Sequence, residues 1–174
     1  LTAIPNNIKQ RLINKLENHL LKAVDRQMLS DVPLGFFLSG GLDSSILVAM
    51  ARKLHPEREI ICYTIKTESM GGFTDDLFYA KKVAKHLNVN LKIIDAKSNI
   101  LEDFDKVIYH LDEPQSDPAP INVYNICKQA RKDGIKVLIG GTAGDDLFSG
   151  YRRHQALRFE HLIEKIPVFF RKLV

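Results

Sequence analysis

The chain has 174 residues, 45% of them hydrophobic and 26% charged, which is enough apolar mass for one well-buried core. It shows no run of about 18 apolar residues and no secretory pattern at its N-terminus, so we expect a cytoplasmic protein without a membrane segment. The net charge of +4 is a local surplus, because residues 1–150 carry 19 basic and 19 acidic side chains. A uniformly basic face for nucleic acid is therefore not expected.

Apolar residues recur at helical spacing over residues 6–29, which predicts a long amphipathic helix that packs on another element. After Pro33, short continuous apolar runs alternate with segments of helical periodicity. We expect strands at 34–38, 60–65, 91–94 and 135–139, and helices at 43–54, 75–87, 99–111 and 121–132.

Strands that alternate with helices predict an open α/β layer, in which a mainly parallel sheet carries helices on both faces. In such sheets ligands bind beyond the carboxyl ends of the strands. Two glycine-rich turns are expected there, because residues 39–45 (SGGLDSS) follow the first strand and residues 140–146 (GGTAGDD) follow the fourth. Both turns are therefore candidate parts of a binding site.

The two cysteines, Cys62 in an expected strand and Cys127 in an expected helix, have no CxxC spacing and no nearby histidine. Cysteine in such places usually behaves as a small hydrophobic residue. We therefore predict two buried free thiols, with no disulfide, metal site or redox role. The six histidines show no metal-binding spacing, and none is assigned a function.

The turn at Ser39, Gly40 and Gly41 has the composition of an anion site. The glycines lack a Cβ, so the backbone can adopt positive φ and bring consecutive N–H groups to one side. The helix that follows adds unpaired N–H groups and the positive end of its dipole, and Ser44 adds a hydroxyl. A carboxylate at Asp43 would repel a phosphate unless a cation lies between them, which predicts Mg²⁺ bound by Asp43. The alternative is a plain turn with Asp43 as the helix cap.

Residues 39–44 resemble the SGGxDS signature of the ATP-pyrophosphatase, or PP-loop, family. The turn has neither the GxxxxGK[ST] of a kinase-type loop nor the GxGxxG of a dinucleotide fold. Residues 110–154 also resemble the synthetase domain of glutamine-hydrolysing asparagine synthetases, through the segments DEPQSDP and GGTAGDDLFSGYRR. The resemblance covers roughly residues 5–160 and implies a PP-loop fold of the adenine nucleotide alpha hydrolase type.

The resemblance implies ATP-dependent amide formation with ATP and Mg²⁺. A carboxylate would attack the α-phosphate, pyrophosphate would leave, and ammonia or an amine would displace AMP from the acyl-adenylate. Asparagine synthesis from aspartate is the leading reaction. The resemblance also implies that two apolar residues at strand ends, Leu38 and Ile65, contact adenine. The alternative is that both side chains only pack in the core. The residues implied to hold pyrophosphate are Ser39, Gly40, Gly41 and Ser44.

Three carboxylates, Asp112, Glu113 and Asp117, lie in a segment stiffened by proline. Clustered carboxylates repel one another unless a cation neutralises them, so Asp117 is a candidate second ligand of Mg²⁺. All three are catalytic candidates that could manage the proton of an attacking amine. A solvated turn is the alternative, because Asp and Pro are turn residues. The pattern does not show which of the three carboxylates binds the metal and which handles the proton.

The resemblance makes the second glycine turn a wall of the pyrophosphate and acyl-adenylate pocket, through Gly141, Thr142, Gly144 and Asp145. The family usually shows Ser-Gly-Glu-Gly where this chain has residues 140–143, so its acidic position is Thr142. A threonine carries no negative charge, which leaves the amine-binding role of that position, and asparagine as the product, open. Helix capping is the alternative for Asp145.

Residues 1–5 look like a linker that would follow an N-terminal glutaminase domain, and the later helices of the family, with their catalytic lysine, have no match here. We therefore expect residues 1–174 to form a single partial domain whose catalytic turnover on its own is poor. Whether the protein forms a homodimer is left open. One alternative is an amidotransferase-like relative that acts on another carboxylate, such as a sugar acid. Others are a catalytically silent nucleotide-binding module and, last, a nucleic-acid-modifying PP-loop enzyme.

Overall fold

The computed structural model describes residues 4–66, 76–95, 100–113, 115, 117, 119–151 and 154. The first three residues of the expected linker, the first residues of two expected helices (75 and 99) and Arg152 lie outside this part. The chain divides into two compact units, residues 1–140 and 141–174. None of the described helices is long and apolar enough to cross a membrane.

Every helix and strand expected from periodicity is present among the described residues, with ends that shift by one or two positions. A short sixth helix follows the last strand. The helices are α1 (Asn6–Gln27), α2 (Leu42–Leu54), α3 (Asp76–Leu87), α4 (Ile100–Tyr109), α5 (Ala119–Lys132) and α6 (Gly144–Phe148). The strands are β1 (Leu34–Phe37), β2 (Ile61–Lys66), β3 (Asn90–Asp95) and β4 (Val137–Ile139).

The four strands form one parallel sheet in the order β3-β2-β1-β4. Phe36 of β1 lies opposite Cys62 of β2 on one side and opposite Ile139 of β4 on the other. The chain moves outward from β1 to β3 and then crosses back to place β4 on the free side of β1. The strand order therefore reverses at β1, and ligand crevices form at such a switch point. The expected parallel α/β fold is confirmed.

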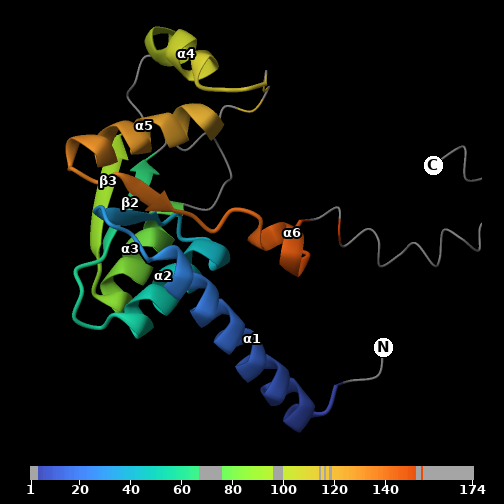
Figure 1. Cartoon of the computed structure of the whole chain (residues 1–174). Helices are drawn as coiled ribbons and strands as arrows, with labels where there is room; N and C mark the ends of the chain where they lie inside the picture. The colour runs from blue at the N-terminus through green and yellow to red at the C-terminus, as the bar shows by residue number, and fades with distance from the viewer. Residues whose placement is uncertain are drawn as a thin grey trace, which may run out of the picture. The chain divides into compact units, whose positions relative to one another are not determined.

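Each face of the sheet has its own hydrophobic core. Helices α2 and α3 lie on one face, with α1 packed against α2, and α5 lies on the other face (Figure 1). Side chains alternate along a strand, so Phe36 and Cys62 point to the α2 side while Phe37 and Tyr63 point to the α5 side. A sheet covered on both faces needs strands that are apolar throughout, which explains the unbroken hydrophobic runs in the sequence.

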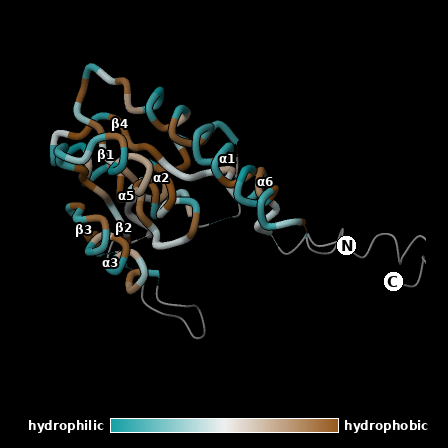
Figure 2. The backbone as a smooth tube through the Cα atoms, turned by 90° about the horizontal axis from the view of Figure 1, so that it is seen from below, coloured by the Kyte–Doolittle hydropathy of each residue, from teal (hydrophilic) through white to brown (hydrophobic). Residues whose placement is uncertain are grey.

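Helix α1 packs through its C-terminal end. Val24 is buried, as is Met28 just beyond the helix, whereas Ile8, Leu12 and Leu16 are 43–50% exposed. The prediction of a packed amphipathic helix is thus correct for the C-terminal half and wrong for the N-terminal half. In Figure 2, α1 carries hydrophilic and hydrophobic residues along its length, while the segments of the sheet are mainly hydrophobic.

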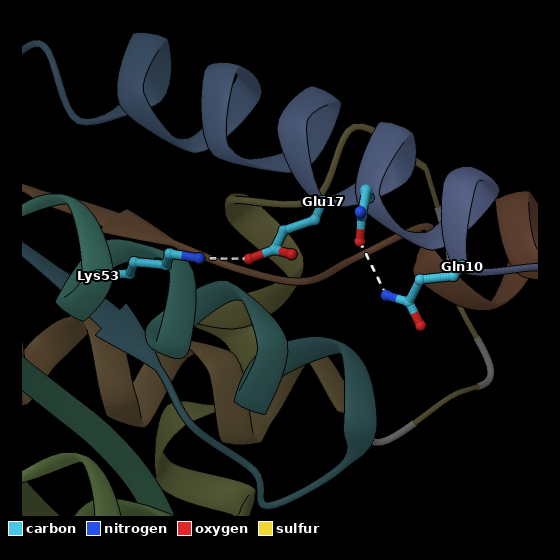
Figure 3. A network of polar contacts seen from close by, with 4 residues as sticks. Gln10, Glu17 and Lys53 are labelled. Atoms are coloured by element: carbon cyan, nitrogen blue, oxygen red, sulfur yellow. Dashed lines mark hydrogen bonds and ion pairs between the residues drawn. The ribbon is translucent and has the colours of Figure 1, made fainter. Parts of the chain in front are cut away.

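Side-chain contacts on the surface join α1 to α2. Lys53, in the last turn of α2, forms an ion pair with Glu17 of α1 (Figure 3). Within α1, Gln10 Nε2 donates a hydrogen bond to Asn14 Oδ1 at 2.9 Å. Exposed pairs of this kind contribute less than about 1 kcal/mol each. The docking of α1 therefore depends mainly on its buried C-terminal end.

Arg52 fastens the end of α2 to the end of α3. Its guanidinium donates hydrogen bonds to the carbonyls of Leu87 at 3.0 Å and Asn88 at 2.7 Å, at a helix end that leaves carbonyls without partners. It also donates to the carbonyls of Pro56 at 2.8 Å and Arg58 at 2.9 Å. A planar fork of N–H donors can make these bonds together, which a lysine cannot do.

Candidate functional site

The turn after β1 leaves the sheet where the strand order reverses. β1 ends at Phe37, and the N–H of Leu38 still donates to the carbonyl of Tyr63 on β2, at 2.9 Å. The chain then passes through residues 39–41 and enters α2 at Leu42. Because β2 and β4 flank β1, the turn lies at the carboxyl edge between two neighbouring strands. This is the place where parallel sheets bind ligands.

Only one of the two glycines in the turn uses the left-handed region. Gly40 has φ +88°, whereas Gly41 has φ −66°, which any residue can adopt. The expectation of positive φ is therefore correct for Gly40 and wrong for Gly41. A Cβ on Gly40 would lie 2.5 Å from the nitrogen of Ala80 and 2.7 Å from the carbonyl oxygen of Asp76, both in α3. A Cβ on Gly41 would meet only Ser39 Oγ, at 3.3 Å.

Three serines surround the turn; two of them contact each other, and all three are hydrogen-bonded to the backbone of Gly41. Ser39 Oγ and Ser44 Oγ lie 3.0 Å apart, and the Gly41 N–H donates to Ser39 Oγ at 3.3 Å. The hydroxyls of Ser44 and Ser45 both donate to the Gly41 carbonyl, at 3.2 and 2.7 Å. A hydroxyl rotates freely about its C–O bond, so these local bonds can be exchanged for bonds to an anion.

Helix α2 begins without a side-chain cap. Its N-cap is Gly41, and no side chain accepts a hydrogen bond from its first turn. Asp43 lies in that first turn and is partly buried, where its charge interacts favourably with the helix dipole. The alternative in which Asp43 caps the helix is therefore not observed. The first N–H groups of α2 are left for solvent or for a ligand.

Leu38 and Ile65, the two expected adenine contacts, lie at neighbouring strand ends but on opposite faces of the sheet. Leu38 is 0% exposed and belongs to the core under α2. Ile65 is partly buried and packs beside Ile94 in the core on the α5 side. The packing role of Leu38 is thus observed directly, and a joint contact of the two side chains with adenine stays a prediction.

Tyr63 joins β2 to the end of α5 beneath the turn. A Cβ on Gly35 of β1 would come within 3.2 Å of its ring, so the glycine makes room for the tyrosine. The Tyr63 hydroxyl donates to Asp133 Oδ2 at 3.0 Å, and Gln129 Nε2 donates to the other oxygen at 2.9 Å. Burial, followed by this hydrogen bond, raises the pKa of Tyr63 to about 12. Burial also raises the pKa of the neighbouring Cys62 thiol to about 12.

The carboxylates Asp112, Glu113 and Asp117 lie between α4 and α5, and all three are exposed. Oδ1 of Asp117 accepts a hydrogen bond from the Ala119 N–H at 2.8 Å, at the start of α5. This is the turn contact that was the alternative for Asp117. Among the described residues, no group of three or more His, Cys, Asp or Glu side chains is placed to hold a metal. Mg²⁺ often takes only one or two carboxylates together with phosphate oxygens, and Asp43 fits that kind of site.

A cavity of about 1080 Å³ lies between α4 and α5. Val107 of α4 and Val123 and Tyr124 of α5 give it a largely apolar wall, and Asp117 also lines it. No residue of the turn after β1 lines this cavity. Of the predicted site residues, it therefore includes only Asp117.

Cys127 also lines the cavity and is exposed, so the prediction of two buried thiols is correct for Cys62 and wrong for Cys127. The reason is the orientation of α5, which turns Ile126 and Ala130 toward the sheet and Cys127 away from it. Partial desolvation in the cavity wall still raises the pKa of the Cys127 thiol. A thiol of raised pKa is a poor nucleophile at neutral pH, and the expected lack of a redox role stays a prediction.

From Gly141 onward the second glycine turn belongs to the unit at 141–174, and its backbone closes on itself. The Gly144 N–H donates to the Gly141 carbonyl at 3.2 Å, and the N-cap of α6 is Ala143 in the left-handed region, with φ +73°. No side chain caps α6, so the capping role that was the alternative for Asp145 is not observed. Thr142, at the expected acidic position, is exposed.

Asp145 packs against the chain that follows α6. Its carbonyl accepts a hydrogen bond from the Gly150 N–H at 2.9 Å, and a Cβ on Gly150 would overlap its carboxylate. A side chain at residue 150 would therefore require the exposed Asp145 carboxylate to move aside. The nucleotide-binding roles expected for Gly141, Thr142, Gly144 and Asp145 stay predictions.

The sequence analysis did not foresee the contact between the first turn and α3. Gly40 packs against the backbone of α3 beside Ala80, which is 0% exposed. A signal was present, because Ala80 and Ala84 place two small residues one turn apart on the same helix face. Small residues there allow a helix to approach its neighbours closely.

Comparisons with known proteins identify the relatives of this chain. A family model described as asparagine synthase matches residues 15–173. Glutamine-hydrolysing asparagine synthetase 1 of Bacillus subtilis is 32% identical over 171 residues, which covers 95% of this chain and 26% of that protein. The chain thus spans about a quarter of the length of this curated relative.

Two solved structures share the fold at low sequence identity. The U34-tRNA thiolase NcsA from Methanococcus maripaludis has a TM-score of 0.57 at 18% identity, over 86% of this chain and 54% of its own. A glutamine-dependent NAD+ synthetase from Acinetobacter baumannii, solved with ADP, has a TM-score of 0.51 at 20% identity, over 79% of this chain and 27% of its own. These likenesses concern the fold alone, and they agree with the expected fold class.

Proposed function

The chain belongs to the asparagine synthase family, and we propose that it is the ATP-binding part of a larger enzyme that forms amide bonds. A carboxylate substrate attacks the α-phosphate of ATP, pyrophosphate leaves, and ammonia or an amine displaces AMP from the acyl-adenylate. Asparagine synthesis from aspartate is the leading reaction, with ammonia supplied by a glutaminase domain. The observation that carries the proposal is the turn after β1, where positive-φ glycine, serine hydroxyls and an uncapped helix start meet at the switch point.

This turn is suited to the leaving pyrophosphate. The first N–H groups of α2 and the helix dipole attract a multiply charged anion, and the hydroxyls of Ser39 and Ser44 can add hydrogen bonds to it. Residues 39–45 contain no lysine to follow a transferring γ-phosphoryl group. The turn is therefore better matched to a pyrophosphate that leaves as one unit than to a kinase reaction.

Asp43 would hold Mg²⁺ together with phosphate oxygens, and the ion would neutralise the charge that develops on the pyrophosphate. The carboxylate lies in the first turn of α2, beside the N–H groups that face the anion. One oxygen of Asp117 accepts a hydrogen bond from the Ala119 N–H. Its other oxygen and the exposed carboxylates of Asp112 and Glu113 are then available to accept the proton of the attacking amine.

Isothermal titration calorimetry with MgATP and magnesium pyrophosphate tests the site directly. We expect the chain to bind both, and Asp43→Asn to weaken both about tenfold, because a charged ligand of the ion is lost. In EDTA the order should reverse, because without the ion the Asp43 carboxylate repels the phosphates and Asp43→Asn does not. The matched control is Asp31→Asn, which removes an exposed carboxylate that precedes β1, at the other end of the strand, and should leave both affinities unchanged.

A wild-type chain that binds neither ligand would refute the nucleotide site. Equal binding by wild type and Asp43→Asn with magnesium present would remove Asp43 from the metal role and leave the rest of the turn in place. The complete reaction is measured as pyrophosphate release by a chain extended to the length of its relatives, with aspartate and ammonia. Nucleotide binding without any release would favour a silent binding module.

A second candidate function is amide formation on another carboxylate, such as a sugar acid. The observation that favours it is Thr142, an exposed neutral residue at a position where the family usually carries an acid. Pyrophosphate release by the extended chain with a panel of carboxylic acids separates the two candidates. Release with aspartate alone would retire the second candidate, and release only with a different acid would retire asparagine synthesis.

A further inference from the structure

The turn after β1 is enclosed on one side by helix α3. A Cβ on Gly40 would lie 2.5 Å from the nitrogen of Ala80, 2.7 Å from the carbonyl oxygen of Asp76 and 2.8 Å from Cβ of Tyr79. Two of these atoms are backbone, and Cβ of Tyr79 moves with the backbone. The contact therefore cannot relax by rotation of a flexible side chain. Any change in the distance between α3 and the sheet must therefore also shift Gly40.

Two buried alanines determine how closely α3 approaches the sheet. Ala80 is 0% exposed and Ala84 is 6% exposed, and both pack in the core that also contains Leu38 and Val48. They lie one turn apart on one face of the helix. Ala80 is level with Gly40, whereas the carbonyl of Ala84 accepts a hydrogen bond from Val89, at the opposite end of α3.

We propose that α3 positions the phosphate-binding turn, and that Ala80 is the positioning residue through its contact with Gly40. The inference rests on the proposed function and deepens it, because it concerns the grip of that site on the pyrophosphate part of ATP. Gly40 can adopt many backbone conformations, and the wall formed by α3 leaves it the one at φ +88°. A turn that is held in its bound conformation loses less conformational entropy when the anion binds.

The test compares Ala80→Val with Ala84→Val in the 174-residue chain. Both variants add the same two methyl groups to the same buried face, so both should lower the urea midpoint to a similar extent. Calorimetry then measures affinity for magnesium pyrophosphate and for adenosine. We expect Ala80→Val to weaken pyrophosphate binding about tenfold and adenosine binding by less than about twofold, while Ala84→Val leaves both within about twofold.

Equal loss of pyrophosphate affinity in the two variants, or no loss in Ala80→Val, overturns the inference, since a purely structural role would affect both alanines alike. If Ala80→Val does not fold, Ala80→Ser and Ala80→Cys supply smaller steps, and pyrophosphate affinity should fall in that order of added volume. Unchanged affinity along this series also overturns the inference. A wild-type chain that binds neither ligand refutes the proposed function itself, so the two failures are distinct.

Discussion

The two glycine-rich turns, 39–45 and 140–146, are similar in composition but are held in different ways. In the first, the left-handed residue is Gly40, and the backbone of α3 packs directly against it. In the second, the left-handed residue is Ala143, and Ser149 adopts the same region at the end of α6, with φ +60°. The second turn is closed by short-range hydrogen bonds within its own segment.

This difference shows that a glycine motif does not by itself reveal which residue takes positive φ. A residue with a Cβ in the left-handed region costs roughly 1–2 kcal/mol, so the second turn carries strain that the first avoids. The first turn instead lies against the backbone of α3, which leaves no room for a side chain at residue 40. We therefore expect substitutions in the first turn to act through packing, and those in the second to act through local backbone strain.

The largest expected effect is at Gly40. Gly40→Ala introduces both a left-handed alanine and an overlap with α3, so we expect a loss of more than about 3 kcal/mol in the free energy of unfolding, measured in urea. Gly41→Ala is the matched control, and its ordinary φ should limit the loss to less than about 1 kcal/mol. Similar losses for the two variants would contradict the assignment of the packed glycine to residue 40.

The next effect concerns the sheet beneath the first turn. The pKa of Cys62 is raised from 9.0 to about 12 and that of Tyr63 from 10.0 to about 12. Each group ionises first in the unfolded chain, so the stability it contributes is complete below its unfolded pKa and is lost as the pH rises toward 12. The free energy of unfolding, measured in urea, should therefore fall from about pH 9 upward, by about 1.4 kcal/mol per pH unit for one group.

Cys62→Ala should flatten this alkaline slope by one proton, whatever its effect on the midpoint at neutral pH. Cys127→Ala is the control, because that thiol is exposed and its ionisation is less closely coupled to folding. An unchanged slope in Cys62→Ala would show that the thiol titrates alike in the folded and unfolded chain.

A smaller effect is expected at Arg52, at the end of α2 that lies away from the first turn. Arg52→Lys cannot reproduce the bonds to the carbonyls of Leu87 and Asn88, so we expect a loss of about 2 kcal/mol in urea unfolding. Affinity for magnesium pyrophosphate should stay unchanged, which would separate general stability from the grip of the turn. The exposed Arg58→Lys provides the control. A parallel loss of affinity would contradict that separation.

The smallest effect is expected in the second turn. Ala143→Gly relieves a left-handed alanine, and we expect a local gain of up to about 1 kcal/mol. Amide hydrogen exchange measures it at the Leu147 N–H, which donates to the Ala143 carbonyl at 3.1 Å. Protection should increase in Ala143→Gly and decrease in Ala143→Val. The reverse order would show that the turn is not strained at this residue.

The fold could be predicted from the sequence because its signals are local. Continuous apolar runs and helical periodicity located every expected strand and helix to within one or two residues. The position of the first turn followed from the same rule, since a turn after a parallel strand lies at the carboxyl edge. The strand order could not be read in this way, because it depends on which runs become neighbours.

The finer features of the site depended on neighbours that are distant in sequence. The sequence could not show that Gly40 would meet α3, or that Leu38 and Ile65 would point to opposite faces. The exposure of Cys127 followed from the rotation of α5, which periodicity defines only loosely. In each case the residue type was read correctly, and its surroundings were decided by tertiary packing.

The strand order β3-β2-β1-β4 also bears on how the chain folds as it is synthesised. β1 ends at residue 37, but its second partner begins only at residue 137. One edge of the central strand therefore stays open on the ribosome until the whole of α5 has emerged, while β1, β2 and β3 can already pair. Because this long-range contact forms late, the docking of β4 would be the slow step of folding. Until then β1 would be the strand most exposed to pairing with a wrong segment.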